Sequence, residues 1–492
     1  METVASDLEA SRDKELTLVL EAVTKKLVDY AKMNGDPDTG SVGISDGPRE
    51  LSEKLKLELP KKGQEYQGLL KDVDMLLDNS AVTWNPGFLE KLYASTNPVG
   101  IASDMLLSVL NTNSHVFTVS PALTLIENKV GHEYAKMFGF EGRFAGGLTF
   151  PGGSYSNSTS LTMARSIKFP DTKTKGNGNY RFAVFASSHA HYSVEKAAIF
   201  CGMGSESVFK IKVDETGCMI VSQLEDAIER AKSQGFTPLY VNATAGTTVL
   251  GSFEDLNAIA DVAKKHNLWM HVDGSWGGNV VFSRKRKYKI SGVERADSLT
   301  VNPHKMLGVP TTCSFLLLPD KRVFQTANSL AAPYLFHNSS DNEEENYDLA
   351  DGTMGCGRRP DALKLYLGWR WYGTEGYEKR IDHAFDVTEY LARSVRDAPD
   401  FVLASEYPPP CLQTCLFYAP QNELSSDPDN NSTITHKISH ELHRQGKFMI
   451  DFAPDPKGRG DFFRVVIVSP IVSSCTVDDL LASIRQIGKT LK

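Results

Sequence analysis

A lysine and an aspartate each follow a short apolar run, at the place where a β-strand would end. Lys305 closes the segment 298–305 (SLTVNPHK), and Asp273 closes the run 268–273 (LWMHVD), after which the chain continues as Gly-Ser-Trp-Gly-Gly. Neighbouring strands of a parallel sheet deliver their carboxyl ends to one edge. We therefore predict that this amine and this carboxylate act together.

That pair indicates a particular chemistry. A lysine amine can form a Schiff base with the aldehyde of pyridoxal phosphate, and a carboxylate beside the pyridine nitrogen keeps that nitrogen protonated, so that the ring accepts electrons. No other pair of residue types in the chain is as informative. Pyridoxal phosphate is therefore the cofactor that the sequence predicts.

The segment 150–157 (FPGGSYSN) has the composition of a phosphate-binding turn. Two glycines allow close approach of the backbone, and the helical run predicted from Ser160 would supply N–H donors at its start. Taken alone, the segment also fits an ordinary turn.

Two further segments follow predicted strands. His191, in 187–193 (SSHAHYS), comes after the apolar run 182–186, where its imidazole can stack on a pyridine ring. Thr248 closes 244–248 (TAGTT), whose hydroxyls can reach the ring substituents or the phosphate. The alternatives are a hydrogen-bonded surface histidine and a threonine-rich turn.

The elements that must position these residues alternate between strand and helix. Helical patterns separate the β-rich runs, which indicates βαβ units, a mostly parallel sheet and functional groups at the carboxyl ends of its strands. The predicted strands are 182–186, 239–243, 268–272, 298–301 and 314–318, and the helices between them include 223–234 and 255–265.

The remaining segments predict a helical N-terminal part and a smaller C-terminal α/β domain. We expect a division into residues 1–110, which would help to form a dimer, 111–375, which would bind the cofactor, and 376–492. The predicted elements are helices at 13–32, 52–79, 124–138 and 359–398, a strand in 401–418, a helix at 433–444, a strand at 462–468 and a final helix at 476–491 capped by Thr476.

Composition excludes several other classes of protein. The 492 residues are 41% hydrophobic and carry a formal net charge of −8, which is typical of a globular protein and disfavours nucleic acid as a partner. Neither a membrane-spanning stretch nor a signal peptide is predicted. The seven cysteines form no CxxC pair and are odd in number, so we expect a reduced compartment, the cytoplasm, and no metal site.

Several motifs in a fixed order resemble the group II pyridoxal-phosphate decarboxylases, most closely the glutamate decarboxylase and cysteine sulfinate decarboxylase branch. The resemblance runs from about residue 50 to the C-terminus. The matching segments are 111–113 (NTN), 151–153 (PGG), 191–193 (HYS), 243–248 (ATAGTT), 271–273 (HVD), 276–278 (WGG), 302–305 (NPHK), 356–358 (CGR) and 462–464 (FFR).

The resemblance implies a pyridoxal-phosphate enzyme of fold type I, like aspartate aminotransferase, which forms a homodimer with active sites at the subunit interface. It assigns Lys305 to the covalent bond with the cofactor, Asp273 to the pyridine nitrogen and His191 to ring stacking. Further cofactor contacts would come from Ser154, Tyr155, Ser156, Thr248, Ser275, Asn302 and His304. Arg464 would hold the substrate α-carboxylate, with Asn157 also contacting substrate, and Tyr334 would donate a proton to Cα.

Two positions depart from the family pattern. Gly274 and Ser275 stand where members commonly carry two alanines. Ser275 is predicted to lie under the ring and offer a hydroxyl to the cofactor, the alternative being a tolerated exchange of small residues. Lys91, in 85–93 (NPGFLEKLY), is predicted to meet the distal acid of a short acidic substrate. Its alternative is a solvent-facing lysine paired with a carboxylate such as Glu90.

The predicted function is therefore decarboxylation of an acidic L-amino acid (aspartate, cysteine sulfinate or glutamate) to the amine and CO₂. One alternative keeps the cofactor but yields an aldehyde, or uses other carbanion chemistry. Tyr334 disfavours it, because loss of that proton donor is the usual sign of the aldehyde route. A second alternative is an inactive regulatory relative, which the intact set of Lys305, Asp273, His191 and Arg464 disfavours.

Overall fold

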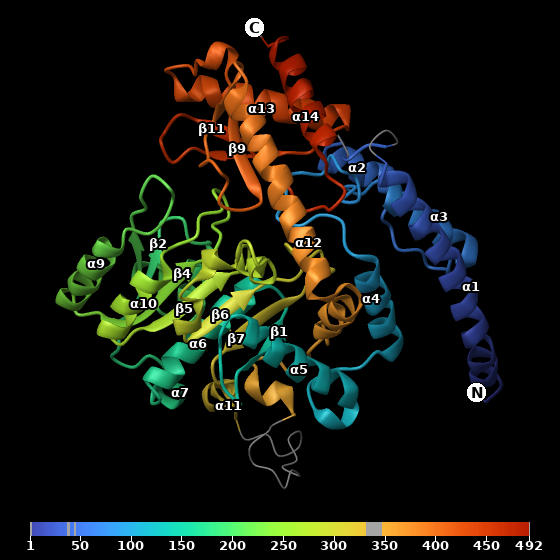
Figure 1. Cartoon of the computed structure of the whole chain (residues 1–492). Coiled ribbons are helices and arrows are strands. Elements are labelled where there is room, and N and C mark those ends of the chain that lie inside the picture. Colours follow the sequence, from blue (N-terminus) through green and yellow to red (C-terminus); the bar gives the residue numbers. More distant parts are fainter. Residues whose placement is uncertain (1, 37–39, 44–45, 331–346, 492) are drawn as a thin grey trace. The chain divides into compact units, whose positions relative to one another are not determined.

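The computed structural model describes residues 2–36, 40–43, 46–330 and 347–491, with side chains from residue 12 onward (Figure 1). It forms two compact units. The smaller unit contains the chain up to residue 95 together with Asp397–Val402 and Leu416–Lys492, and the larger contains Thr96–Arg396 and Leu403–Cys415. The three-part division expected from the sequence remains a prediction about domains.

The larger unit is built on a seven-stranded sheet with the order β1-β7-β6-β5-β4-β2-β3. Strands β6, β5, β4, β2 and β3 run parallel to their neighbours, whereas β7 is antiparallel to both β6 and β1. The strands are β1 (Gly146–Phe150), β2 (Phe182–Ser187), β3 (Val208–Ile211), β4 (Thr237–Thr244), β5 (Trp269–Gly274), β6 (Ser298–Val301) and β7 (Ser314–Leu318). This mixed, mostly parallel sheet confirms the predicted fold class.

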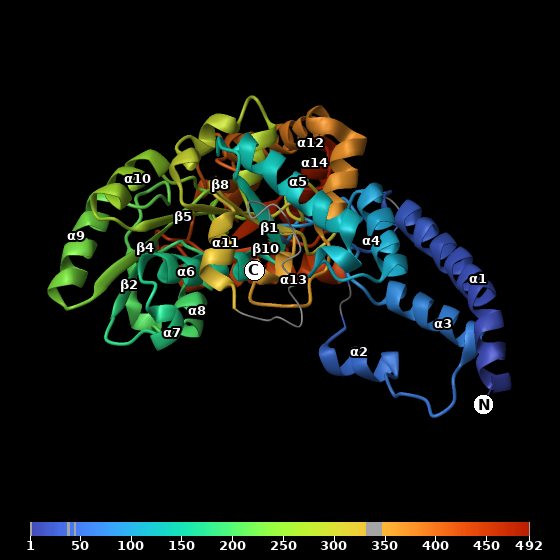
Figure 2. The ribbon, with the colours of Figure 1, turned by 90° about the horizontal axis from the view of Figure 1, so that it is seen from below.

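Helices cover both faces of this sheet, which is why its central strands are buried along their whole length and read as apolar runs. Figure 2 shows α10 on one side of the strands and α6 with α8 on the other. The helices of this unit are α4 (Pro98–Leu110), α5 (Pro121–Met137), α6 (Gly153–Lys168), α7 (Thr172–Lys175), α8 (Ser193–Phe200), α9 (Val221–Ser233), α10 (Leu256–Lys265), α11 (Arg322–Asn328) and α12 (Ala362–Asp397).

Some elements differ from the sequence prediction. Strands β1 and β3 are not among the predicted strands. Strand β1 begins with two glycines, and β3 is four residues long and only partly buried, so neither has a strong apolar pattern in the sequence. Helix α6 begins at Gly153 rather than near Ser160, because the serines and asparagine of its first turns are buried against the sheet instead of forming a polar loop. Helix α12 contains a break at Gly373, where φ is +67°.

The smaller unit combines helices with most of a four-stranded sheet of order β10-β11-β9-β8, of which Leu403 in β8 and residues 413–415 in β9 count with the larger unit. Helices α1 and α3 lie side by side (Figure 1), joined by an ion pair of 2.6 Å between Lys26 and Asp74. The elements are α1 (Glu2–Asn34), α2 (Pro48–Leu55), α3 (Glu65–Asp78), β8 (Phe401–Leu403), β9 (Gln413–Tyr418), α13 (Pro428–Gln445), β10 (Asp451–Pro454), β11 (Asp461–Val466) and α14 (Ser474–Gly488).

The start of α14 corrects one prediction. Ser473, not Thr476, is the N-cap, and its hydroxyl accepts from the backbone N–H of Thr476. Thr476 stands at the third helical position and its hydroxyl accepts from the backbone N–H of Ser473, which completes a capping box. Among the described residues, no helix is both long and apolar enough to span a bilayer.

Candidate active site

A cavity of about 220 Å³ opens at the carboxyl ends of the parallel strands of the larger unit. Its walls come from the start of α6 and from the segments that follow β2, β4, β5 and β6. Predicted site residues that line it are Ser154, Asn157, His191, Thr248, Asp273, Ser275, Asn302, His304 and Lys305, and Gly153, Tyr192, Thr244, Gly246 and Trp276 complete it. The fold thus brings together residues that are up to about 150 positions apart in the sequence.

Asp273 lies at the end of β5 and is only 4% exposed. Its Oδ1 accepts from the backbone N–H of Ser275 at 3.0 Å, and its Oδ2 accepts from Asn157 Nδ2 at 2.8 Å. Burial by itself raises the pKa of this carboxyl, but the hydrogen bond from Ser275 and the nearby charge of Lys305 act against burial, and the pKa lies below its usual value. Asp273 is therefore an anion with lone pairs still available toward the cavity.

Lys305 stands four residues after the end of β6, and it lines the same cavity as Asp273. Its backbone N–H donates to Asn302 O at 3.1 Å, and that carbonyl also accepts from Asn279 Nδ2 at 3.0 Å. The tight turn therefore fixes the direction of the lysine backbone. The amine and the carboxylate predicted to act together face one cavity.

His191 follows β2 and is held by Ser193 at the start of α8. The hydroxyl of Ser193 lies 2.8 Å from His191 Nδ1, and the backbone N–H of Ser193 donates to the same nitrogen at 3.2 Å. Burial lowers the pKa of His191, so its imidazole is neutral at pH 7. A neutral ring fixed at one nitrogen is suited to lie against a flat heterocycle.

His304 precedes Lys305 and is anchored to the antiparallel strand region. Its Nδ1 lies 2.7 Å from Cys313 O and 3.1 Å from Cys313 N. Burial lowers the pKa of His304 to about 4, so this ring is also neutral at pH 7.

The start of α6 forms a cradle that a side chain would fill. A Cβ on Gly153 would lie 2.6 Å from Ser275 Oγ and 2.9 Å from Asn302 Nδ2, and Gly152 has a φ of +114°. The first N–H groups of a helix have no intrahelical acceptor and favour a phosphate. With an amine, a carboxylate and an imidazole on the other walls, these residues fit pyridoxal phosphate.

Two residues of the same helix do not line the cavity. Tyr155 is 56% exposed, and Ser156 is buried with its Oγ 2.9 Å from Ser314 Oγ. Ser154 and Asn157 do line it, as expected for positions three apart on one helix face. The cofactor contacts of Tyr155 and Ser156 remain predictions.

Arg464 and Lys91 lie in the smaller unit and share a carboxylate. Arg464 Nη2 is 2.8 Å and Lys91 Nζ is 3.1 Å from Asp451 Oδ2, because β10 and β11 place Asp451 opposite Arg464. Lys91 also pairs with Glu90 at 2.5 Å, which is the ion pair expected in the alternative to a substrate-binding role. Tyr334 and the acidic segment 338–346 lie outside the described residues.

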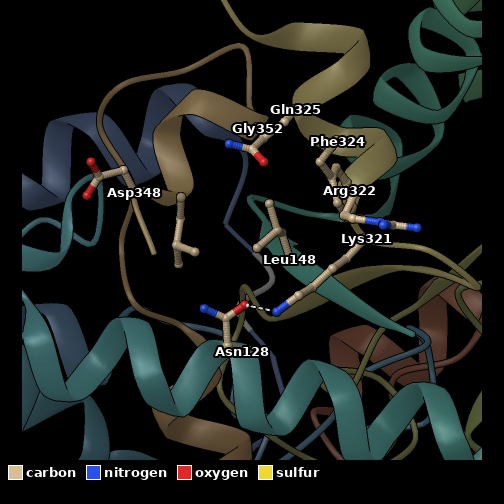
Figure 3. Close-up of a pocket in the computed structure, with 9 residues that line it drawn as sticks. Asn128, Leu148, Lys321, Arg322, Phe324, Gln325, Asp348 and Gly352 are labelled. Carbon is tan, nitrogen blue, oxygen red and sulfur yellow. Dashed lines mark hydrogen bonds between the residues drawn. The ribbon is translucent and has the colours of Figure 1, made fainter. Parts of the chain in front are cut away.

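Other hollows have less chemistry to offer. The one in Figure 3 holds about 40 Å³ between α5, β1 and α11, and Lys321 Nζ donates across it to Asn128 Oδ1 at 3.0 Å. A larger one of about 400 Å³ is lined mostly by α6, α11 and the chain near Met354. Neither contains the strand-end residues. Among the described residues, no three His, Cys, Asp or Glu side chains gather as metal ligands.

Residues 48–414 match the family model described as the pyridoxal-dependent decarboxylase conserved domain. The chain belongs to this family. It is a pyridoxal-phosphate-dependent amino-acid decarboxylase, and the cofactor predicted from Lys305 and Asp273 is confirmed at the level of the family.

Relatives of this decarboxylase cover almost all of its length. It is 47% identical over 443 residues to L-aspartate decarboxylase dtxS4 of Metarhizium robertsii, covering 90% of this chain and 87% of the relative. It is 34% identical to glutamate decarboxylase-like protein FG08083 of Gibberella zeae, covering 97% of each. The crystal structure of mouse CSAD in apo form superposes with a TM-score of 0.90 at 34% identity, covering 97% of this chain and 99% of that one.

One buried residue beside the decarboxylase cavity lies in the matching segment 271–273 but has no role predicted from the sequence. His271 contacts Asn157 at 3.0 Å and has no exposed surface. Its signal was present: His271 and Asp273 are two positions apart on a strand, so their side chains point to the same face of the sheet.

Proposed function

We propose that this decarboxylase removes the α-carboxylate of an acidic L-amino acid, giving the amine and CO₂, with aspartate as its first candidate substrate. The observation that carries the proposal is the single cavity onto which Lys305, Asp273 and His191 converge. The family and the 47% identical relative, named as an L-aspartate decarboxylase, support the reaction and the substrate class.

In this proposal the strand-end residues hold the cofactor. Pyridoxal phosphate, when bound, supplies an electron sink for the pair left on Cα when the carboxylate departs. Lys305 would provide the amine that attaches it, and the anionic Asp273 would hold a proton on its ring nitrogen. The neutral His191 would lie against the ring.

The remaining wall residues would fix the phosphate and the ring substituents. The start of α6 at Gly153 and Ser154 would bind the phosphate through backbone N–H groups and the serine hydroxyl. The other proposed contacts are Thr248, Ser275, Asn302 and His304, all on the cavity wall, with Tyr155 and Ser156 from the same helix.

Arg464 and Lys91 would bind the two carboxylates of the substrate. Both cations are already held on the oxygen of Asp451, which is chemically equivalent to a substrate carboxylate. We propose that the substrate takes the place of that shared partner, its α-carboxylate on Arg464 and its distal acid on Lys91. A guanidinium suits the first role because it can contact a carboxylate with two parallel hydrogen bonds.

The amine product requires a proton on Cα, and Tyr334 is the proposed donor. Replacement Tyr334→Phe should slow that protonation and divert product from the amine to a carbonyl compound. Unchanged product ratios would remove Tyr334 from this role. A wild-type enzyme that makes the carbonyl compound would favour the aldehyde-forming alternative.

The proposal is tested by incubating the purified holoenzyme with aspartate, cysteine sulfinate, glutamate and an aromatic amino acid, and identifying the products by mass spectrometry. We expect amines from the acidic substrates, with aspartate the fastest. Turnover of the aromatic amino acid alone would contradict the assigned substrate class. Absence of visible cofactor absorbance in the purified protein would contradict the proposal that it works as a pyridoxal-phosphate enzyme.

We also propose that the enzyme is a homodimer. Helix α4 presents apolar side chains to solvent at a helical spacing, among them Ile101, Met105 and Val109, and Val109 is 63% exposed. Such a face favours burial against a second copy. Sedimentation should give a dimer for the wild type and a smaller species for Val109→Asp.

The seven free cysteines support a cytoplasmic location.

A further inference from the structure

A chain of buried polar side chains runs behind Asp273, inside the larger unit. It links helix α6 to strands β4, β5 and β6, and each member is less than 5% exposed. The members are Asn157, Ser160, Tyr240, Trp269, His271 and Ser298. Buried polar groups are costly unless they are paired, so the direction of each hydrogen bond can be worked out from its neighbours.

Asn157 is the member that touches Asp273. Its Nδ2 donates to Asp273 Oδ2 at 2.8 Å and to Ser193 Oγ at 3.1 Å. The opposite orientation of the amide would place its oxygen against the anionic carboxylate, where both atoms only accept. The amide nitrogen therefore faces Asp273, and Asn157 Oδ1 faces the other way, toward His271.

This orientation decides the protonation of His271. Asn157 Oδ1 only accepts, and it lies 3.0 Å from His271 Nε2, so that nitrogen must carry a hydrogen. The same N–H lies 3.4 Å from Thr300 Oγ1, a weaker acceptor. Burial lowers the pKa of His271, so the ring is neutral and its Nδ1 is an acceptor.

The remaining hydrogen bonds of this buried series have the same direction. Ser298 Oγ lies 2.8 Å from His271 Nδ1 and must donate to it. Ser298 Oγ then accepts from Trp269 Nε1 at 2.9 Å and from Ser160 Oγ at 2.8 Å, and Ser160 Oγ accepts from the hydroxyl of Tyr240 at 3.0 Å. Every donor thus points along the chain toward Asp273.

A branch from Asn157 reaches the second ring contact. Ser193 Oγ accepts from Asn157 and lies 2.8 Å from His191 Nδ1. Because the backbone N–H of Ser193 already donates to that nitrogen, Nδ1 is an acceptor, and the Ser193 hydroxyl donates to it. Asn157 therefore sets the direction of the hydrogen bonds at both Asp273 and His191.

We propose that His271, as the neutral tautomer with hydrogen on Nε2, is a positioning residue that acts through Asn157 to hold Asp273 and His191 in place for the cofactor ring. This rests on the proposed roles of Asp273 and His191. It also reassigns Asn157, whose amide hydrogens and oxygen are engaged with protein partners, from substrate binding to positioning. An apolar filling of the same space would satisfy packing alone, but would not fix the hydrogen bonds of Asp273.

The first test measures the protonation of the histidine ring directly and needs no substrate. The holoenzyme is labelled with ¹⁵N-histidine, and the imidazole resonances of its twelve histidines are recorded between pH 6 and 8, with His271→Gln identifying the signal of residue 271. We expect a protonated Nε2 and an unprotonated Nδ1 that stay constant over this range. A charged ring, or hydrogen on Nδ1, would overturn the proposal.

The second test measures the dissociation constant of pyridoxal phosphate. His271→Leu removes the donor to Asn157 and should weaken cofactor binding about ten-fold or more. His271→Gln keeps an N–H donor within reach of Asn157 and should stay within about three-fold of the wild type. In an Asn157→Ala background, His271→Leu should weaken cofactor binding little further, because both substitutions break the same series of hydrogen bonds to Asp273.

His132→Gln is the control, since this histidine is partly buried and its Nδ1 lies 2.7 Å from Ala145 O, but it does not line the cavity. Equal losses in His271→Gln and His271→Leu, or additive losses with Asn157→Ala, would reduce His271 to a packing residue. Failure of the wild type to bind the cofactor would instead refute the proposed function.

Discussion

At the scale of single residues, chemistry here depends on which side chain closes each strand. Thr244, Asp273 and Thr300 stand opposite one another in the register of β4, β5 and β6, so the polar groups that follow these strands share one edge. A lysine after β6 then meets the same cavity as the aspartate of β5. Neither residue alone would indicate a cofactor.

Lys305→Ala should abolish the visible absorbance of the bound cofactor and all turnover, because the alanine has no amine to attach the aldehyde. Absorbance spectra and product assays measure both effects. Lys265→Ala is the control, as Lys265 is an exposed lysine paired with Glu225. Normal turnover in Lys305→Ala would refute the assignment.

Lys91→Ala should raise KM for the acidic substrate about ten-fold and change kcat much less, since a charge-assisted contact made in both the bound state and the transition state is lost. Lys91→Arg, which keeps the charge, should retain most of the affinity. Steady-state kinetics give both constants. An unchanged KM would leave Lys91 as the partner of Glu90 and Asp451.

At the scale of elements, the start of α6 is the feature on which the cofactor cavity most depends. The helix begins at Gly153, so its first N–H groups stand at the cavity instead of within a loop. Ser154 and Asn157 then follow on the same face of the helix, and Asn157 reaches across to β5. In the proposed site, one helix would thus serve both the phosphate and the pyridine ring.

Gly153→Ala should weaken binding of pyridoxal phosphate about ten-fold, because the new methyl group would press on Ser275 and Asn302 in the cradle. A fluorescence titration with the cofactor measures this. Gly63→Ala, where a Cβ would meet open space, is the control. Wild-type affinity in Gly153→Ala would show that the phosphate binds elsewhere.

At the scale of the whole molecule, stability depends on buried groups that change charge with pH. Glu254 is buried, and its Oε2 accepts from the backbone N–H of Thr244 at 2.8 Å. Burial raises the pKa of Glu254 to about 7. The folded pKa exceeds the unfolded one. The favourable contribution of Glu254 to the free energy of unfolding is therefore complete below about pH 4.5 and is lost as the pH rises through about 7.

Glu254→Gln should therefore raise the unfolding temperature at pH 8 and change it little at pH 5. The shift of the pKa corresponds to a difference of about 3 kcal/mol at most. Thermal unfolding of both proteins at the two pH values checks this, with exposed Glu58→Gln as the control. The same gain at both pH values would show that charge on Glu254 is not the cause.

The sequence alone determined the fold class, the cofactor and most of the cavity wall. Those properties follow from local patterns, namely apolar runs that become buried strands and polar residues that come directly after them. Lys305, Asp273, His191 and Thr248 were all found in this way. The family match confirmed the cofactor.

Only the tertiary structure decided how the polar groups pair. The early start of α6, the shared Asp451 carboxylate between Lys91 and Arg464, and the chain from Tyr240 to Asp273 all depend on contacts between segments far apart in the sequence. Local pattern sets which face of a strand or helix a residue occupies. Which hydrogen-bond partner it meets there is set by the packing of other elements against that face.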